Sequence, residues 1–229
     1  MTGNGDMLDD EGLLPLFPLQ TVLFPGGLLP LKVFEARYLD LISQCLRNQT
    51  GFGVVCIGQT GGLGSLAELH QAKPGGPGAR PGREPASAAI GLETVGVLAT
   101  LLDVDAEQAG ILRVRCQGGV RLDLSAPRQR EDGLWLAEAS AWEEESECAV
   151  PDTLQASARA LAQAIESLAA QDQRPFLQPY QMNSAGWVAN RWCEILPISL
   201  AAKQRLMVLD EPALRLKLVD EYLRSKGVI

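Results

Sequence analysis

The chain has 229 residues, a mass of 24.6 kDa and a net charge of −8, with 46% apolar and 21% charged residues. This composition excludes a wholly disordered protein and is enough to bury a sizeable core. No apolar run approaches the roughly 20 residues of a membrane-spanning helix, and the first residues show no secretory signal, so a cytoplasmic protein is expected. The acidic balance argues against nucleic acid and anionic lipid as partners, because phosphate is bound by clustered lysine and arginine.

The charge is unevenly distributed along the chain. Residues 1–148 hold 11 basic and 20 acidic side chains, whereas residues 149–229 hold 9 and 8. Such a shift indicates a change of module near residue 148. The sequence therefore predicts a disordered tail at 1–12, a β-rich domain at 13–148 and a helical subdomain at 149–229.

Short segments rich in apolar and β-branched residues dominate the first half of the chain. Strands are expected at 13–19, 21–24, 28–31, 51–57, 94–101, 112–116, 120–124 and 134–139. Two prolines in the first of these place it at a sheet edge or between bends, because proline cannot donate to a central ladder. Gln117-Gly118-Gly119 is typical of a hairpin turn. The period-two alternation on both sides of this turn predicts an antiparallel sheet with one face toward the core.

One helix interrupts the strands. Phe34, Tyr38, Leu41 and Cys45 recur at spacings of four, three and four, which predicts a helix from Val33 to about residue 48 with one apolar face. We expect the phenylalanines of this N-terminal region to be core residues: Phe17, Phe24 and Phe34.

The second half has helical periodicity. Helices are expected at 154–168, around 187–195, at 200–209 and at 210–223, which is enough for a small bundle. Ser199 is predicted to cap the third of these helices, and Asp210 the fourth, with Pro212 in its first turn. The acidic run 143–147 before them is typical of a solvated linker.

Catalytic and metal chemistry find little support. The only histidine, His70, lies in a segment, 58–91, that holds nine glycines and four prolines and is expected to be a flexible insertion. That segment contains neither a P-loop nor a dinucleotide-binding fingerprint. The five cysteines include no C-x-x-C pair and are expected to be reduced, mostly buried thiols. No catalytic residue, metal or cofactor is predicted.

The N-terminal motifs carry a more specific signal. Leu14-Pro15-Leu16-Phe17-Pro18-Leu19, Val22-Leu23-Phe24-Pro25-Gly26, Leu29-Pro30-Leu31 and Val33-Phe34-Glu35-Ala36-Arg37-Tyr38-Leu39 follow one another at tight spacing. This run resembles the opening of the Lon protease N-terminal domain, the LON substrate-binding domain. Leu196-Pro197-Ile198-Ser199-Leu200 is similar to the family's helical segment, and the likeness spans most of 13–223.

The resemblance implies an α+β fold: a β-rich, PUA-like pseudo-barrel followed by a small C-terminal helical bundle. It also implies recognition of polypeptide, linked to protein quality control or proteolysis. Because the chain shows neither the ATPase nor the peptidase motifs of a full Lon protease, we expect a stand-alone, non-catalytic member. Two alternatives stay open: an RNA-binding PUA-like protein, and an enzyme with a small ligand between its domains.

Five residues are candidates for contact with a polypeptide or protein partner. Glu35, Arg37 and Tyr38 either face a groove or tie the helix to the barrel. Trp187 and Arg191 share a helix face at i and i+4, and contact either a partner or the β-rich domain. A separate set of arginines marks either a binding face for RNA or the solvated face of the predicted hairpin: Arg113, Arg115 and Arg121.

Overall fold

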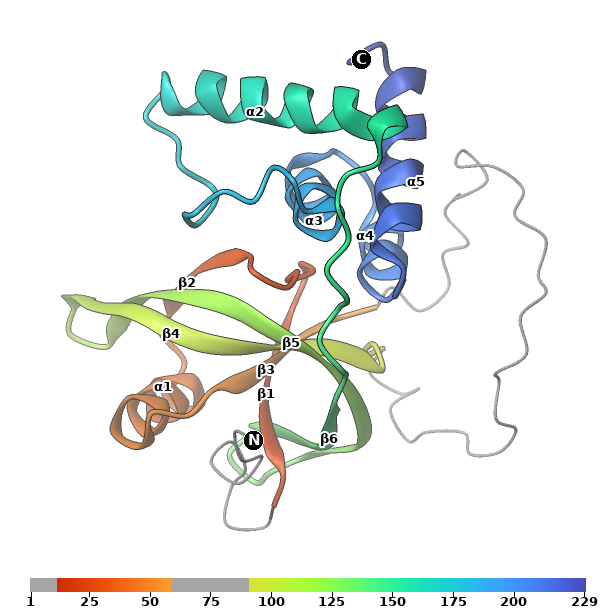
Figure 1. The fold of residues 1–229 in the computed structure, drawn as a ribbon. Helices are drawn as coiled ribbons and strands as arrows, with labels where there is room; N and C mark the ends of the chain where they lie inside the picture. Colours follow the sequence, from red (N-terminus) through yellow and green to blue (C-terminus); the bar gives the residue numbers. More distant parts are fainter. Residues whose placement is uncertain (1–11, 59–90) are drawn as a thin grey trace.

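The computed structural model describes residues 12–58 and 91–229, and it places a sheet between one helix and a group of four (Figure 1). The elements are β1 (Leu14–Leu19), β2 (Leu28–Val33), α1 (Ala36–Asn48), β3 (Phe52–Cys56), β4 (Val95–Gln108), β5 (Ile111–Gln129), β6 (Trp135–Ala141), a 3₁₀ turn (Asp152–Leu154), α2 (Gln155–Ala169), α3 (Ala185–Ile195), α4 (Leu200–Met207) and α5 (Pro212–Ser225). The predicted α+β class is confirmed. The predicted tail and insertion fall almost wholly outside the described residues.

The six strands form one mixed sheet that curls into a ring short of a true barrel. Their order is β2-β5-β4-β3-β1-β6, and β5 also pairs with β6, which closes the ring and leaves β2 outside it. β1 and β3 are parallel, with Leu16 opposite Gly53. Of the two positions expected for β1, the sheet edge is wrong, because β1 pairs with β3 on one side and β6 on the other. Each proline removes only one donor, on one side of the strand.

β5 is one continuous strand of 19 residues, so the predicted hairpin turn at 117–119 is wrong. The turn that joins β4 to β5 lies at Ala109 and Gly110 instead. Gly118 exchanges backbone hydrogen bonds with the preceding loop, donating to Gly27 at 2.9 Å and accepting from Gly26 at 2.8 Å. A Cβ on Gly118 would lie 2.3 Å from the Phe24 carbonyl oxygen. Glycine at this position therefore allows a close approach of two backbones.

The loop that meets β5 contains residues 21–24, which were expected to form a strand. They are not in a strand, although Val22, Leu23 and Phe24 are buried. Their β-branched and aromatic side chains fill the core rather than a ladder.

Aromatic packing joins α1 to the ring. Phe17 and Phe24 are buried as expected, and the Tyr38 ring stacks on Phe17 with centroids 4.1 Å apart. Phe34 is 64% exposed, so its predicted core position is wrong. The reason is local: α1 begins at Ala36, so Phe34 precedes the helix and does not share its buried stripe.

The C-terminal helices begin much as the sequence predicts. The Ser199 hydroxyl accepts a hydrogen bond from the backbone N–H of Ala202 and caps α4. Pro212 occupies the first turn of α5, but Glu211 rather than Asp210 is the N-cap residue. None of the helices in the described ranges is long and apolar enough to cross a membrane. The five cysteines are unpaired thiols, and all but the half-buried Cys148 are buried.

The predicted module boundary at residue 148 lies in the extended segment between β6 and the 3₁₀ turn. One cluster of buried apolar side chains includes Phe17 and Phe24 from the sheet side together with Leu161 and Val188 from the helices. The boundary itself stays a prediction.

Candidate functional site

An ionic cluster built on two buried arginines joins the sheet to the helices. We call it the junction cluster, and its members are Arg121, Glu145, Asn190, Asp210 and Arg215. Glu145 Oε1 lies 2.5 Å from Arg215 Nη2 and 3.4 Å from Arg121 Nη2. Arg121 also reaches Asp210 at 2.7 Å, and Arg215 donates to Asn190 Oδ1 at 2.9 Å. The expectation that Arg121 lies on a solvated face is wrong, since its side chain is 3% exposed. Its guanidinium pairs with carboxylates from outside β5, and this pairing offsets the cost of burying the charge.

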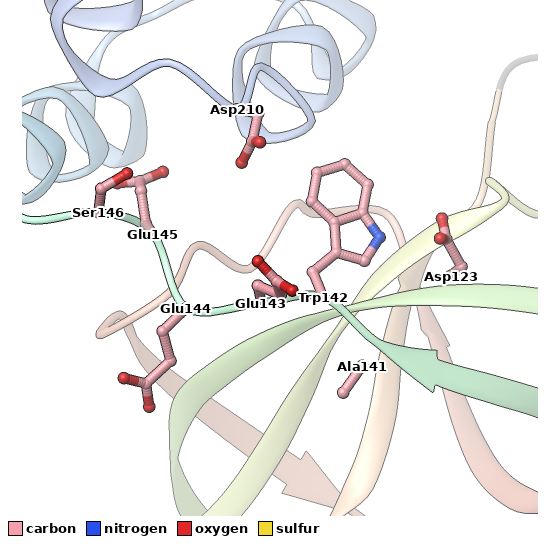
Figure 2. A pocket seen from close by; sticks show the side chains of 8 residues that line it. All are labelled: Asp123, Ala141, Trp142, Glu143, Glu144, Glu145, Ser146 and Asp210. Carbon is pink, nitrogen blue, oxygen red and sulfur yellow. The ribbon is translucent and has the colours of Figure 1, made fainter. Parts of the chain in front are cut away.

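A polar groove of about 380 Å³ lies beside the junction cluster, and Figure 2 shows the residues that line it. The Arg121 guanidinium lies 4.5 Å from the centroid of the Trp142 ring. Glu143 and Glu144 are exposed, as expected of a linker, but Glu145 is not a solvated residue. Of the five carboxylates that line the groove, Glu145 and Asp210 pair with the buried arginines and so neutralise charge within the fold.

On another side of the same junction lies an apolar cavity of about 230 Å³, which we call the β2–α3 cleft. The loop before β2 and the first half of β2 form one wall, and α3, α4 and the segment before α3 form the other. Its lining is Thr21, Val22, Leu23, Leu28, Leu29, Pro30, Pro175, Phe176, Glu194, Ile195 and Lys203. The cleft therefore offers mainly apolar walls with one carboxyl and one ammonium group.

The polar end of the cleft is electrostatically unusual. Glu194 Oε1 lies 2.7 Å from Arg191 Nη2, and Lys203 Nζ donates to the Glu194 backbone carbonyl at 2.9 Å. Burial raises the pKa of the Glu194 carboxyl to about 8, although the charges of Arg191 and Lys203 act to lower it. The Glu194 carboxyl therefore takes up a proton at a higher pH than an exposed glutamate does.

The structure brings Trp187 and Arg191 together, as their spacing predicts. The Arg191 guanidinium lies 5.7 Å from the Trp187 ring centroid, and its side chain is 0% exposed. It donates to the backbone carbonyl of Pro25 at 2.8 Å and to that of Gly26. These bonds fix the loop that forms one wall of the cleft, so Arg191 reaches the sheet side of the junction rather than open solvent.

The other three candidates lie at the start of α1, away from the C-terminal helices (Figure 1). Arg37 pairs with Glu35, and its guanidinium lies 5.2 Å from the centroid of the Tyr38 ring. Tyr38 itself is buried against Phe17. The five candidates therefore form two separate groups, of which only Trp187 and Arg191 are near the cleft.

Comparisons with known proteins agree with this fold. A family model described as the ATP-dependent protease La (LON) substrate-binding domain matches residues 13–225. The chain belongs to the LON substrate-binding domain family. The resemblance in the N-terminal motifs is thereby confirmed.

Two solved structures are similar to this LON domain. A Lon N-terminal domain protein from Xanthomonas campestris is 27% identical, with a TM-score of 0.64, over 92% of this chain and 98% of the other. The N-terminal domain of the Mycobacterium avium complex Lon protease shares the fold at 14% identity, with a TM-score of 0.54 over 93% and 98% of the chains. No curated protein sequence matches this chain.

Sequence reasoning missed the residues that give the cleft its character. Glu194 interrupts the otherwise apolar run Trp192-Cys193-Glu194-Ile195, and this was the only local signal available. Phe176 and Lys203 come from segments that meet Glu194 only in the folded chain. Within residues 12–58 and 91–229, no group of three or more histidine, cysteine or acidic side chains is arranged to hold a metal ion.

Proposed function

We propose that this LON substrate-binding domain is a non-catalytic polypeptide-recognition module and that it engages polypeptide at the β2–α3 cleft. The cleft supports this role because it joins apolar walls to a few polar groups, the usual make-up of a binding site. Its volume of about 230 Å³ is below the ~300–1,000 Å³ of clefts that take whole small ligands. It is suited instead to one or two side chains of a longer chain.

The two alternative functions have weaker support. Of the three arginines proposed for RNA, Arg121 is buried in the junction cluster and Arg113 pairs with Glu107 at 2.8 Å. A single arginine, Arg115, is too little for a phosphate-binding face. The enzyme alternative would need a reactive group in the cleft, but Lys203 is held by a backbone carbonyl and Glu194 by Arg191.

The test is a fluorescence-anisotropy titration against a labelled, reduced and carboxymethylated polypeptide, repeated with single-stranded RNA at two salt concentrations. We expect saturable polypeptide binding with a dissociation constant of tens of micromolar or tighter, which corresponds to at least about 6 kcal/mol. No saturable polypeptide binding would reject the proposal. Binding of RNA alone, with a steep salt dependence, would favour the RNA-binding alternative.

A matched pair of leucine variants locates the site. Leu28 is half-buried in the cleft, whereas Leu46 is 50% exposed on α1. Leu28→Ser is expected to weaken polypeptide binding about tenfold, and Leu46→Ser to leave it unchanged. Equal effects of the two substitutions would move the site away from the cleft. Circular dichroism melts of both variants establish that they remain folded.

A further inference from the structure

The β2–α3 cleft continues along β2 into a second depression. That depression has a volume of about 440 Å³, and Pro30 lines both it and the cleft. Its other walls come from Lys32 of β2 and from the neighbouring stretches of β4 and β5. Since a strand rises about 3.3 Å per residue, Leu28 in the cleft and Lys32 in the depression are about 13 Å apart. Together the two hollows suit an extended segment of about five residues.

Strand β2 is suited to support such a segment. Among the strands in the described part of the chain, β2 pairs with β5 alone, so its second edge has no strand partner. Leu28, Pro30 and Lys32 alternate with residues packed on the core, Leu29 and Val33. An extended chain beside β2 would repeat this alternation, so its side chains at positions two apart would point the same way.

Three cations and two carboxylates line the depression: Lys32, Arg113, Arg115, Asp103 and Asp105. Lys32 and Arg113 both engage Glu107, at 3.2 and 2.8 Å, and these contacts lower the pKa of Glu107 to about 2. Arg115 is an exposed cation for which the described residues supply no ion pair, although Asp103 is its register neighbour on β4. Arg115 lies opposite Pro30 on β2, at the boundary of the cleft and the depression. Asp105 also lines the depression, so what distinguishes Arg115 is a guanidinium with no ion pair in the described residues, which a carboxylate on a bound segment could contact.

We propose, resting on the function proposed above, that the domain prefers an extended segment with an apolar side chain in the β2–α3 cleft and an aspartate or glutamate two or four positions away. The apolar side chain packs against Leu28 and Phe176, and the carboxylate contacts the Arg115 guanidinium. Even spacing is required because a carboxylate at an odd spacing points to the opposite side of an extended chain. Polypeptide recognition of this kind combines strand geometry with pockets for alternate side chains.

The test uses labelled ten-residue peptides of serine, threonine and glycine with one central leucine. One aspartate is placed two, three or four positions from the leucine, on either side, and each peptide has an asparagine twin. Anisotropy titrations at low salt are expected to show threefold to fivefold tighter binding for aspartate at even spacings, as for an exposed ion pair. Raising the salt concentration should reduce this preference.

Two arginine variants separate the possible outcomes. Arg115→Gln should abolish the aspartate preference while leaving binding of the asparagine peptides intact, and Arg159→Gln, an exposed site on α2, should change neither. Peptide binding that is sensitive to Leu28→Ser but equal for aspartate and asparagine would overturn this inference and leave the proposed function standing. A preference that survives in Arg115→Gln would also overturn it. Absence of peptide and polypeptide binding would reject the proposed function itself.

Discussion

Removing the Glu145 carboxylate tests how the helices are held on the sheet. In Glu145→Ala, Arg215 loses contacts to both carboxylate oxygens, at 2.5 and 3.3 Å, and Arg121 loses one at 3.4 Å. Arg121 keeps Asp210, but Glu145 is the only carboxylate that Arg215 contacts in the described part of the chain. The variant therefore leaves one buried guanidinium without a counter-charge.

The expected magnitude follows from this asymmetry. Breaking a buried pair by removing one partner costs about 3–5 kcal/mol. Arg215 retains hydrogen bonds to Asn190 and to the Leu206 carbonyl, both at 2.9 Å, which places the loss near the lower end of that range. A loss of about 3 kcal/mol corresponds to a fall in the melting temperature of about 6–12 °C for a chain of this length.

Urea unfolding followed by circular dichroism, with thermal melts alongside, measures this loss. Glu144→Ala is the matched control, because Glu144 is exposed and immediately precedes Glu145. It is expected to change the free energy of unfolding by less than about 0.5 kcal/mol. If the two variants unfold at the same urea concentration, the pairing of Glu145 with Arg215 does not stabilise the fold. Substituting Arg215 with methionine in the Glu145→Ala background should recover part of the loss, since no uncompensated charge then remains.

Glu194→Gln is expected to alter the pH dependence of stability, because burial raises the folded-state pKa of the Glu194 carboxyl from 4.5 to about 8. The stabilising contribution of the protonated carboxyl is full below about pH 4.5 and is lost as the pH rises through 8. Between pH 5 and pH 8 the variant should lose less free energy of unfolding than the wild type, and equal losses in urea titrations would contradict this. Phe34→Ser should change stability by less than about 0.5 kcal/mol, whereas Phe24→Ala should cost about 3–5 kcal/mol, compared by urea midpoints; a large loss at Phe34 would place it in the core after all. Ser199→Ala should cost about 1 kcal/mol in the same assay, and no change would mean that the cap is not needed.

Local periodicity predicted the kinds of element and their order, but not how the strands pair. The alternation on either side of Gly118 was interpreted correctly as β structure, yet the glycines at 118 and 119 were assigned to a turn. A glycine in a strand can equally mark a close approach of another backbone. Here the approaching backbone is Phe24–Gly27, more than 90 residues earlier in the chain, and no local signal reports it.

For the candidate site too, predictions that depend on local spacing succeeded and one that depends on tertiary contacts failed. Trp187 and Arg191 were found because they are one helical turn apart, and their contact depends only on that spacing. Arg121 was assigned to an exposed binding or solvated face because it alternates with the apolar Val120 and Leu122. The residues that compensate its charge are Glu145 and Asp210. Such compensation depends on tertiary contacts between distant segments, so the pattern around Arg121 alone could not predict it.

The same tertiary contacts hold one wall of the proposed site in place. Gly118 holds the loop before β2 from the sheet side through Gly26 and Gly27. Arg191 holds it from the helix side through the carbonyls of Pro25 and Gly26. Because the wall of the cleft is fixed from both directions, the polypeptide binding proposed above would place little ordering cost on the domain, and its cost would lie mainly in straightening the polypeptide. Segments that are already extended should for this reason bind more tightly than compact ones with the same side chains.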